Sequence, residues 1–528
     1  MQIVQKYIPF FLSALLMCVV LYIIYPHYQY YIDPDGTAYL TISKRYATGD
    51  YQRAINGYWS PWSCWLTALL IKTGLSPIPA SIIINAIGAT GFLYISQSFF
   101  LKFNLTRRLQ WLMCITLAFF LCYAVFAQSF DDLWECFFLL STLRIILSDR
   151  FKEQPVLWIA MGFIGTLAYF AKAYSFPFFI LNTICCTYFI CKDDKAQWIK
   201  ISATAIGVMV VCGLPWIWLL HNKYGIWTTS TAGTLNMSWY LEGHPHWKEG
   251  INLLIPPGYN DSPYYWEDPW LANGATPHFW NSASLLWQQI WRGGYHVVLF
   301  IIAALQLSVF FPLIVIICLS AQFFKKATIN IDQRVKVIMT SFLLFPLGYF
   351  LINFEARYLW YMVPLSMALG AILLMEKPFK LRLSYKALSF IFPLSYLIVP
   401  ASGLYQMYGA GKIEFDLAQK MKSSGIHGSF TGNVSHRFME RLAYFSDNQY
   451  YYILPFSDGR TRTAGIYNEL TKYKVNYYIH YKTGPTASIF DDMELCNDSS
   501  FVAENAKHIN EVRSGDFSPL NIYIIAHE

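Results

Sequence analysis

Long apolar segments recur along the first three quarters of the chain. A helix needs roughly 17–25 apolar residues to cross a bilayer, and about eleven segments approach or reach that length. They lie near residues 7–25, 80–101, 109–127, 133–148, 156–172, 174–190, 199–220, 296–323, 336–352, 358–375 and 386–405. The pattern predicts a polytopic α-helical membrane protein with about 11 spans.

The stretch between the first two predicted spans, residues 26–79, is too polar to cross the membrane. Thr37 to Thr48 is expected to form a helix on the membrane surface with four apolar side chains toward the lipid: Ala38, Leu40, Ile42 and Tyr46. The run WSPWSCWLTALLIKTGL is more apolar but too short to span. We expect it to form a second interfacial helix.

Residues 406–528 have a different pattern. Polar segments with helical character (413–424, 435–446 and 461–474) alternate with the strand-like runs GSFTGN, QYYYIL, VNYYIHY and LNIYIIAH. This alternation predicts a small α/β domain that follows a transmembrane catalytic domain at 1–405. No glycine-rich phosphate-binding fingerprint is present, so no cofactor is assigned.

Composition and charge agree with a membrane location. Only 13% of the 528 residues are charged, against about 25% in soluble domains. Lys and Arg (39) outnumber Asp and Glu (32), and the excess lies on residues 1–405, at alternate connections between spans. By the positive-inside rule the N-terminus is inside, while the first loop, residues 221–295 and the C-terminus are outside. The 11 cysteines form no CxxC pair, so neither disulfides nor a zinc site is predicted.

Two aspartates, Asp33 and Asp35, follow the first predicted span in YYIDPDGTAYLTI. One interpretation is a surface turn, because Asp, Pro and Gly favour turns. However, a carboxylate pair at the edge of a bilayer is costly, since hydrocarbon solvates charge poorly and like charges repel. The pair is therefore a candidate catalytic centre.

Further charges lie at the other predicted outer ends of spans: Asp131, Asp132, Lys172, Glu355 and Arg357. Asp132 could instead cap a helix, and Lys172 could extend along apolar surface to reach water. Together the charges suggest a single cavity that opens at the outer face. In the long loop at 221–295, Glu267 and Asp268 are further cavity candidates among many aromatic residues. Those rings suit either sugar stacking or anchoring at the interface.

The order of these features resembles the GT-C class of integral-membrane glycosyltransferases. PDGTAYLTI follows the first span, WSPWSCWL comes next, an aspartate pair precedes span four, and RYLWYMVP lies late in the membrane part. The resemblance covers roughly residues 1–375, with the lipid A aminoarabinose transferases, the protein O-mannosyltransferases and their bacterial relatives as the nearest groups. It implies a sugar donor carried on a polyprenyl phosphate and consumed on the outer face of the cell membrane.

The resemblance also assigns roles to residues. Asp35 matches the catalytic aspartate of the class, because it follows the same proline and precedes the same surface helix, and Asp33 is its neighbour. The chain has Gly36 where relatives often have Glu, and Ser60 where the aminoarabinose transferases have Lys. A carboxylate can take the proton of an acceptor hydroxyl, and a single base with direct displacement would invert the anomeric carbon. Arg357 and Lys172 are expected to bind the donor phosphate. No cofactor is certain, and a divalent metal stays open.

The expected partners are the polyprenyl-phosphate sugar donor, a lipid, glycan or protein acceptor, and membrane lipids, but no nucleic acid. Two alternatives stay open. A membrane polysaccharide polymerase or ligase would rest its chemistry on arginines in the long outer loop, where the chain has only Arg292. A non-enzymatic lipid-linked glycan transporter would place charges in mid-membrane and show repeated halves, and no repeat is evident.

Overall fold

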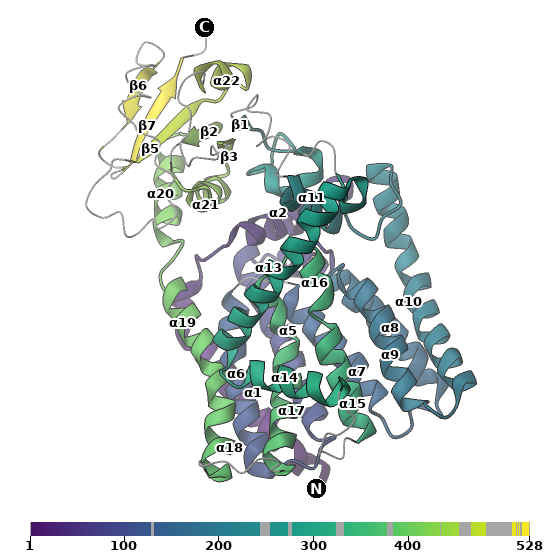
Figure 1. Cartoon of the computed structure of the whole chain (residues 1–528). Helices are drawn as coiled ribbons and strands as arrows, with labels where there is room; N and C mark the ends of the chain where they lie inside the picture. The colour runs from purple at the N-terminus through teal and green to yellow at the C-terminus, as the bar shows by residue number, and fades with distance from the viewer. Residues whose placement is uncertain are drawn as a thin grey trace. The chain divides into compact units, whose positions relative to one another are not determined.

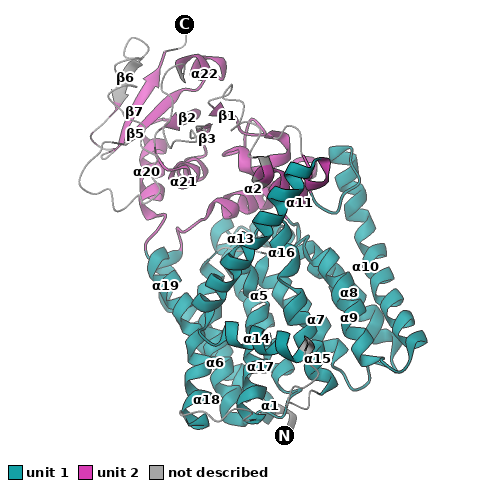
Figure 2. Ribbon diagram, viewed as in Figure 1, with its two compact units in different colours: residues 1–28, 60–230, 282–408 teal, residues 29–59, 231–281, 409–528 magenta. Residues whose placement is uncertain are grey.

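The computed structural model describes most of the chain. The described residues are 2–127, 131–242, 254–272, 277–323, 332–376, 384–432, 434–453, 466–481, 509–513, 515, 517 and 520–526. They divide into two compact units, which Figure 2 shows in different colours. Unit 1 comprises Met1–Tyr28, Ser60–Ser230 and Ser282–Tyr408, and unit 2 comprises Gln29–Trp59, Thr231–Asn281 and Gly409–Glu528.

Unit 1 is built from helices (Figure 1). They are α1 (Gln2–Tyr28), α4 (Trp62–Lys72), α5 (Pro77–Phe100), α6 (Arg107–Phe126), α7 (Asp132–Ile146), α8 (Pro155–Ala171), α9 (Ser175–Ile190), α10 (Lys195–Tyr224), α13 (Ala283–Leu307), α14 (Phe311–Phe323), α15 (Gln333–Leu344), α16 (Leu347–Leu351), η4 (Ala356–Leu359), α17 (Met362–Glu376), α18 (Tyr385–Leu394), η5 (Ser395–Leu397) and α19 (Ile398–Met407). Within the described ranges, seven helices are long and apolar enough to cross a membrane, and four shorter ones are apolar. This composition supports a polytopic membrane protein.

The predicted span at 296–323 is wrong as a single helix. The structure has two helices there, because α13 ends at Leu307 and α14 begins at Phe311. Ser308 between them has an extended backbone (φ −166°, ψ 136°), and its hydroxyl accepts a hydrogen bond from the Phe310 amide at 3.2 Å. The side chain thus satisfies a backbone donor that a continuous helix would have paired internally.

Small residues let the helices of unit 1 approach closely. A Cβ atom added at Gly162 of α8 would lie 2.4 Å from the carbonyl oxygen of Ala205 in α10. Close backbone approach at small residues is a common way for membrane helices to gain packing energy. A residue larger than glycine at position 162 would therefore push α8 and α10 apart.

Unit 2 combines short helices with two sheets. Its elements are α2 (Pro34–Thr48), α3 (Tyr51–Ala54), α11 (Ala232–Glu242), β1 (Leu254–Ile255), η1 (Tyr265–Glu267), η2 (Pro269–Ala272), η3 (Phe279–Asn281), α20 (Lys412–Ser423), β2 (Ser429–Gly432), α21 (His436–Ser446), β3 (Gln449–Tyr450), β4 (Tyr452–Ile453), α22 (Ile466–Lys472), β5 (Tyr477–Tyr481), β6 (Ile509–Arg513) and β7 (Leu520–Ile525). The predicted helix at 461–474 lies partly outside the described residues; its described part contains α22.

The larger sheet has the strand order β3-β2-β5-β7-β6. β2 pairs in parallel with β3 and β5, whereas β7 pairs antiparallel with β5 and β6. The smaller sheet joins β1 of the long loop to β4, with Leu254 opposite Ile453. A segment of the long loop is therefore held by main-chain pairing to a segment near the C-terminus.

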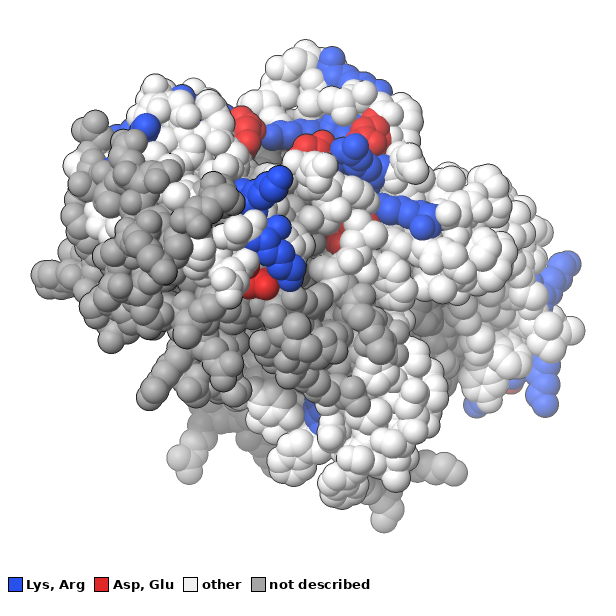
Figure 3. All heavy atoms as spheres, turned by 90° about the horizontal axis from the view of Figure 1, so that it is seen from above, with Lys and Arg blue, Asp and Glu red and all other residues white. Residues whose placement is uncertain are grey.

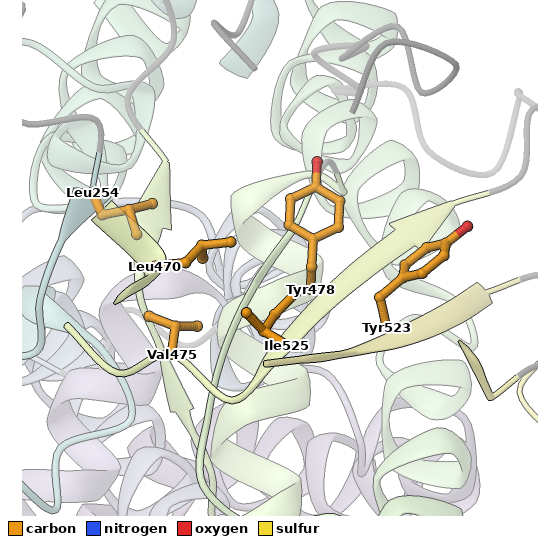
Figure 4. Close-up of a cluster of buried hydrophobic side chains, with 6 residues drawn as sticks. All are labelled: Leu254, Leu470, Val475, Tyr478, Tyr523 and Ile525. Atoms are coloured by element: carbon orange, nitrogen blue, oxygen red, sulfur yellow. The ribbon is translucent and has the colours of Figure 1, made fainter. Parts of the chain in front are cut away.

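A compact apolar cluster lies beside these strands. Figure 4 shows its members at close range: Leu254, Leu470, Val475, Tyr478, Tyr523 and Ile525. Each is at most 6% exposed. Burial of apolar surface stabilises by about 25 cal/mol per Å², so the cluster fixes β1, α22, β5 and β7 together.

Helix α2 ends at Thr48 as predicted for the surface helix, but it begins at Pro34 rather than Thr37, and its surroundings differ from the prediction. The four side chains expected to face lipid are 0%, 1%, 1% and 7% exposed, in the order Ala38, Leu40, Ile42 and Tyr46. The prediction that they face lipid is therefore wrong, because the protein itself covers them. Apolar periodicity indicates which face of a helix is buried but does not distinguish protein from lipid as the covering material.

Candidate functional site

Asp35 lies in the first turn of α2, in unit 2. Asp33 is the N-cap residue of this helix, and its carboxylate accepts a hydrogen bond from the Gly36 amide at 2.7 Å. Pro34 occupies the first turn, where a missing amide hydrogen costs nothing. The two aspartates thus have different surroundings: Asp33 holds the start of the helix, and Asp35 stands one residue inside it.

The indole of Trp266 orients the Asp35 carboxylate. Its Nε1 donates a hydrogen bond to Oδ1 of Asp35 at 3.3 Å. Trp266 is itself held, because its carbonyl accepts a hydrogen bond from Nε1 of Trp59 at 2.8 Å. The next carbonyl, that of Glu267, accepts from Nδ2 of Asn56 at 2.7 Å. A neutral donor that is fixed in this way orients Asp35 without cancelling its charge.

Aromatic rings surround this hydrogen bond. Trp239 stacks on Trp266 with ring centroids 5.3 Å apart, and Tyr58 lies 5.4 Å from the same ring. Edge-to-face and offset stacked pairs contribute about 0.5–1.5 kcal/mol beyond their buried area. Trp239 and Trp266 both belong to the long loop, so part of its aromatic content lies next to Asp35.

Arg45 of α2 is the centre of a buried ionic network. Its guanidinium forms an ion pair with Glu267 and a second one with Asp261 at 3.0 Å. Burial alone would lower the pKa of Arg45, but its hydrogen bonds to Glu267 and Asp261 raise that pKa above the ordinary value. In turn, the hydrogen bond from Arg45 lowers the pKa of Asp261. The network joins α2 to the loop that carries Trp266.

Glu267 and Asp268, the candidates from the long loop, are almost fully covered, at 1% and 0% exposure. Glu267 accepts hydrogen bonds from Arg45 and Ser262. Asp268 accepts one from the Tyr259 hydroxyl at 3.2 Å. These partners indicate that the two carboxylates hold the loop, and their role in a substrate cavity stays a prediction.

A second group of charges lies in unit 1. Lys172, which follows the last residue of α8, forms an ion pair with Asp132 at the start of α7. Nε of Arg357, in η4, lies 3.6 Å from Oδ2 of Asp132 and 2.8 Å from Oε2 of Glu355. The side chains of Lys172 and Arg357 are 20% and 21% exposed, so a bound molecule could contact both. Two cations therefore share one buried carboxylate.

Aromatic rings also support the cations of unit 1. Nζ of Lys172 lies 4.0 Å from the ring centroid of Tyr358, a cation–π distance. The Tyr358 hydroxyl donates to Oε1 of Glu355 at 3.0 Å. The ring thus keeps the ammonium in place while its hydroxyl orients the neighbouring carboxylate.

Asp131 and a carboxylate that the sequence did not single out complete this region. Oδ1 of Asp131 accepts a hydrogen bond from Ser63 of α4 at 2.6 Å. Glu135, one turn further along α7, accepts from Ser175 at 2.9 Å and is 2% exposed. The sequence did carry a signal for Glu135: it is an acidic residue within an apolar segment, three positions after Asp132. Positions three apart share a helix face.

The predicted site residues therefore divide between the units. Asp33, Asp35, Glu267 and Asp268 belong to unit 2, whereas Asp131, Asp132, Lys172, Glu355 and Arg357 belong to unit 1. Figure 3 shows that basic and acidic side chains on one face of the molecule occur in small neighbouring groups among uncharged residues. Among the described residues, no group of three or more His, Cys, Asp or Glu side chains is arranged to hold a metal ion.

Comparison with known proteins places the fold. No protein-family model matches the chain, and no curated protein matches it in sequence. The crystal structure of ArnT from Cupriavidus metallidurans bound to undecaprenyl phosphate is similar over 97% of both chains, with a TM-score of 0.51 and 11% identity. The oligosaccharyltransferase of Archaeoglobus fulgidus, in complex with zinc and sulfate, is similar over 90% of this chain and 68% of its own, with a TM-score of 0.54 and 13% identity.

Both neighbours are GT-C glycosyltransferases, ArnT being a lipid A aminoarabinose transferase. At these identities the similarity concerns the fold alone. Together with the apolar helices it supports a multi-pass membrane protein. The chain thus has the fold of the GT-C glycosyltransferases, as the resemblance in its sequence predicted.

Proposed function

We propose that the protein transfers a sugar, a hexose or a pentose, from a polyprenyl-phosphate donor to an acceptor hydroxyl on the outer face of the cell membrane. One observation carries the proposal: the Asp35 carboxylate is oriented by Trp266 in a chain with the fold of the GT-C glycosyltransferases. The undecaprenyl phosphate in the ArnT structure supports the class of donor. The acceptor is a lipid, a glycan or a protein.

In this reaction Asp35 is the general base. One carboxylate oxygen accepts a hydrogen bond from Trp266, and the carboxylate takes the proton of the acceptor hydroxyl. As that proton moves, the hydroxyl oxygen bonds to the anomeric carbon, and the bond from that carbon to the phosphate oxygen breaks. The products are the glycosylated acceptor and the polyprenyl phosphate. Direct displacement by one nucleophile inverts the anomeric configuration.

Lys172 and Arg357 are proposed to bind the donor phosphate. Negative charge grows on the leaving phosphate, and fixed cations stabilise such charge most when they need no reorganisation. Arg357 can bind phosphate through two N–H groups, and Lys172 adds a point charge. Without substrate, Asp132 and Glu355 balance these cations. Asp131, held by Ser63, is assigned a supporting position in the same region.

The polymerase or ligase alternative is weaker because of where Arg292 lies. This arginine is on α13, and its guanidinium donates to the Ile352 carbonyl at 3.0 Å and to His296 at 3.3 Å. It is 9% exposed. These contacts tie Arg292 to helix packing, which disfavours a role in a reaction at the membrane surface.

The deciding experiment uses the full chain in lipid nanodiscs with polyprenyl-phosphate-linked hexoses and pentoses as donors. Release of polyprenyl phosphate and formation of a glycosylated product are measured with lipid, glycan and peptide acceptors. General-base catalysis contributes about 10²- to 10⁴-fold, so Asp35→Asn should lower the transfer rate by that factor. A transporter would move the lipid-linked sugar across the bilayer without breaking its phosphate bond.

Asp33→Asn is the matched control for this experiment. Asn caps helices about as well as Asp, so this variant should keep the fold of α2 and most of the transfer rate. Equal abundance of both variants in the membrane is checked first. Wild-type transfer by Asp35→Asn would overturn the assignment of the base, and absence of transfer by the wild type with every donor would overturn the proposed function.

A further inference from the structure

A buried carboxyl group on α21, that of Glu440, has no role in the site described so far. Glu440 is 3% exposed, and its Oε2 has no hydrogen-bond partner among the described residues. The next residue, Arg441, pairs with Glu414 of α20 at 2.9 Å. Buried carboxyl groups are normally paired or hydrogen-bonded, and one that lacks a partner needs a physical reason.

The position of Glu440 points toward α2, the helix that carries Asp35. Tyr444 of α21 contacts α2, because Nζ of Lys44 lies 4.3 Å from its ring centroid. Residues four apart share one face of a helix, so Glu440 lies on the same face as Tyr444, one turn nearer to the start of α21. Figure 1 shows α2 and α21 as neighbouring helices, both within unit 2.

Tyr264 links this position to Asp35. Its hydroxyl donates a hydrogen bond to the carbonyl of Pro34, the residue before Asp35. Burial raises the pKa of Tyr264, and the charges of Glu440 and Asp35 raise it further. Tyr264 thus contacts the backbone beside Asp35 and lies within electrostatic reach of both carboxyl groups.

The charges around Glu440 disfavour its ionised form. Burial is the largest cause that raises the pKa of Glu440 well above its ordinary value. Arg441 and Arg437 on α21 oppose that rise, while Asp35 and Asp33 on α2 add to it. Arg441 also pairs with Glu414 of α20, and Lys44 lies over the ring of Tyr444. Burial raises the pKa of both Tyr264 and Tyr265. Burial without a hydrogen-bond partner for Oε2 in the described part of the chain therefore favours the neutral form of Glu440.

We propose that Glu440 is a positioning residue of the Asp35 site: its buried carboxyl group, on the face of α21 toward α2, stays neutral in the folded protein. The C-terminal segment thereby packs a neutral acid against α2, the helix that carries Asp35. Its effect on catalysis rests on the proposed function, whereas the protonation of Glu440 does not. The two can be tested separately.

The first test measures stability and needs no activity. In the folded protein Glu440 has a raised pKa, so its contribution to stability is present at low pH and is lost as the pH rises from the unfolded value of about 4.3 toward the folded value. Glu440→Gln mimics the neutral acid and lacks this loss. Its midpoint of thermal unfolding should equal that of the wild type near about pH 4 and exceed it by about 2 °C or more near about pH 8.

Glu414→Gln is the matched control on the adjacent helix. It removes the ion pair with Arg441, so its midpoint should fall near neutral pH rather than rise. A second signature is the C=O stretch of a protonated carboxylic acid in the infrared spectrum at neutral pH, which Glu440→Gln should remove. If Glu440→Gln follows the wild type at every pH and the infrared band is unchanged, Glu440 is ionised and the proposal is overturned.

The second test measures the pH profile of transfer. Glu440→Gln should keep the transfer rate within about threefold at neutral pH, and its profile should lack one ionisation that the wild type shows on the alkaline side. Identical profiles would overturn the positioning role even where the stability test succeeds. Failure of all transfer by the wild type would count against the proposed function alone.

Discussion

The two charged regions of the molecule hold their acidic groups in opposite ways. In unit 1, Asp132 is buried against two cations, Lys172 and Arg357. In unit 2, Asp35 accepts a hydrogen bond from a neutral indole, and Arg45 on the same helix pairs with Glu267 and Asp261. One region therefore pairs its carboxylate with two cations, and in the other the indole that contacts Asp35 is a neutral donor.

This difference matches two different chemical tasks. A general base must remain able to accept a proton, and a cation paired with it would reduce that ability. A phosphate site needs cations that are positioned before the substrate arrives, and a carboxylate between them lowers their mutual repulsion.

Arg45→Ala should cause the largest loss, and the loss should be one of stability. The substitution leaves Glu267 buried without its ionic partner, and breaking a buried pair in this way costs about 3–5 kcal/mol. Trp266 directly precedes Glu267 in the same loop, so the hydrogen bond from Trp266 to Asp35 should weaken as well. Thermal unfolding and protease sensitivity of the segment around Trp266 measure this effect.

Arg53→Ala is the control for Arg45. Its guanidinium pairs with the same Asp261 at 2.9 Å, but its side chain is 45% exposed. Exposed ion pairs contribute about 0–1 kcal/mol, so this variant should be nearly as stable as the wild type. If Arg45→Ala were stable but inactive, Arg45 would contact substrate, and the contrast between the two regions would fail.

The sequence predicted local features of both regions better than their connections. The helices at α2 and α7 follow from apolar periodicity within one segment, whereas their caps do not: Asp33 caps α2, and Asp131 rather than Asp132 precedes α7, with no side-chain cap among the described residues. The ion pair between Arg45 and Glu267 could not be predicted in this way, because either residue alone is compatible with a solvated surface. The pairing of Leu254 with Ile453 is likewise set by the fold rather than by a local pattern.

The candidate site shows the same limit. Asp35 could be separated from Asp33 only through the resemblance, since a turn and a catalytic pair have the same local sequence. In the structure Asp33 caps α2 and Asp35 accepts from Trp266, so their surroundings differ. Trp266 was one of many aromatic residues in its loop, and nothing in the sequence distinguished an indole that contacts a carboxylate from one that anchors the loop.

Arg357→Gln and Lys172→Gln should lower kcat/KM for the donor by about 10- to 150-fold each. This range corresponds to the loss of a hydrogen bond to a charged group, about 1.5–3 kcal/mol. Arg357→Lys should retain part of the activity, since it keeps the charge but loses the bidentate geometry. Steady-state kinetics with varied donor concentration measure the effect.

Arg334→Gln controls for a general effect of removing a cation. Arg334 pairs with Asp149 at 2.8 Å, and both side chains are largely exposed. Its replacement should leave kcat/KM within about twofold, because such pairs contribute little. If Arg357→Gln lowered the amount of folded protein without changing kcat/KM, the cations of unit 1 would hold helices together rather than bind phosphate.

Trp266→Phe should have the smallest effect and gives the sharpest view of unit 2. The substitution keeps an aromatic ring against Tyr58 and Trp239 but removes the N–H that donates to Asp35. Loss of one neutral hydrogen bond, about 0.5–1.5 kcal/mol, should lower kcat by about 3- to 10-fold with KM unchanged. Trp239→Phe, which leaves the Trp266 indole in place, should lower kcat less. If Trp266→Phe instead raised KM with kcat unchanged, the ring would bind substrate rather than orient the base. Asp35 would then need another partner to hold it, and the distinction between a carboxylate held by a neutral donor and one held by cations would lose its basis.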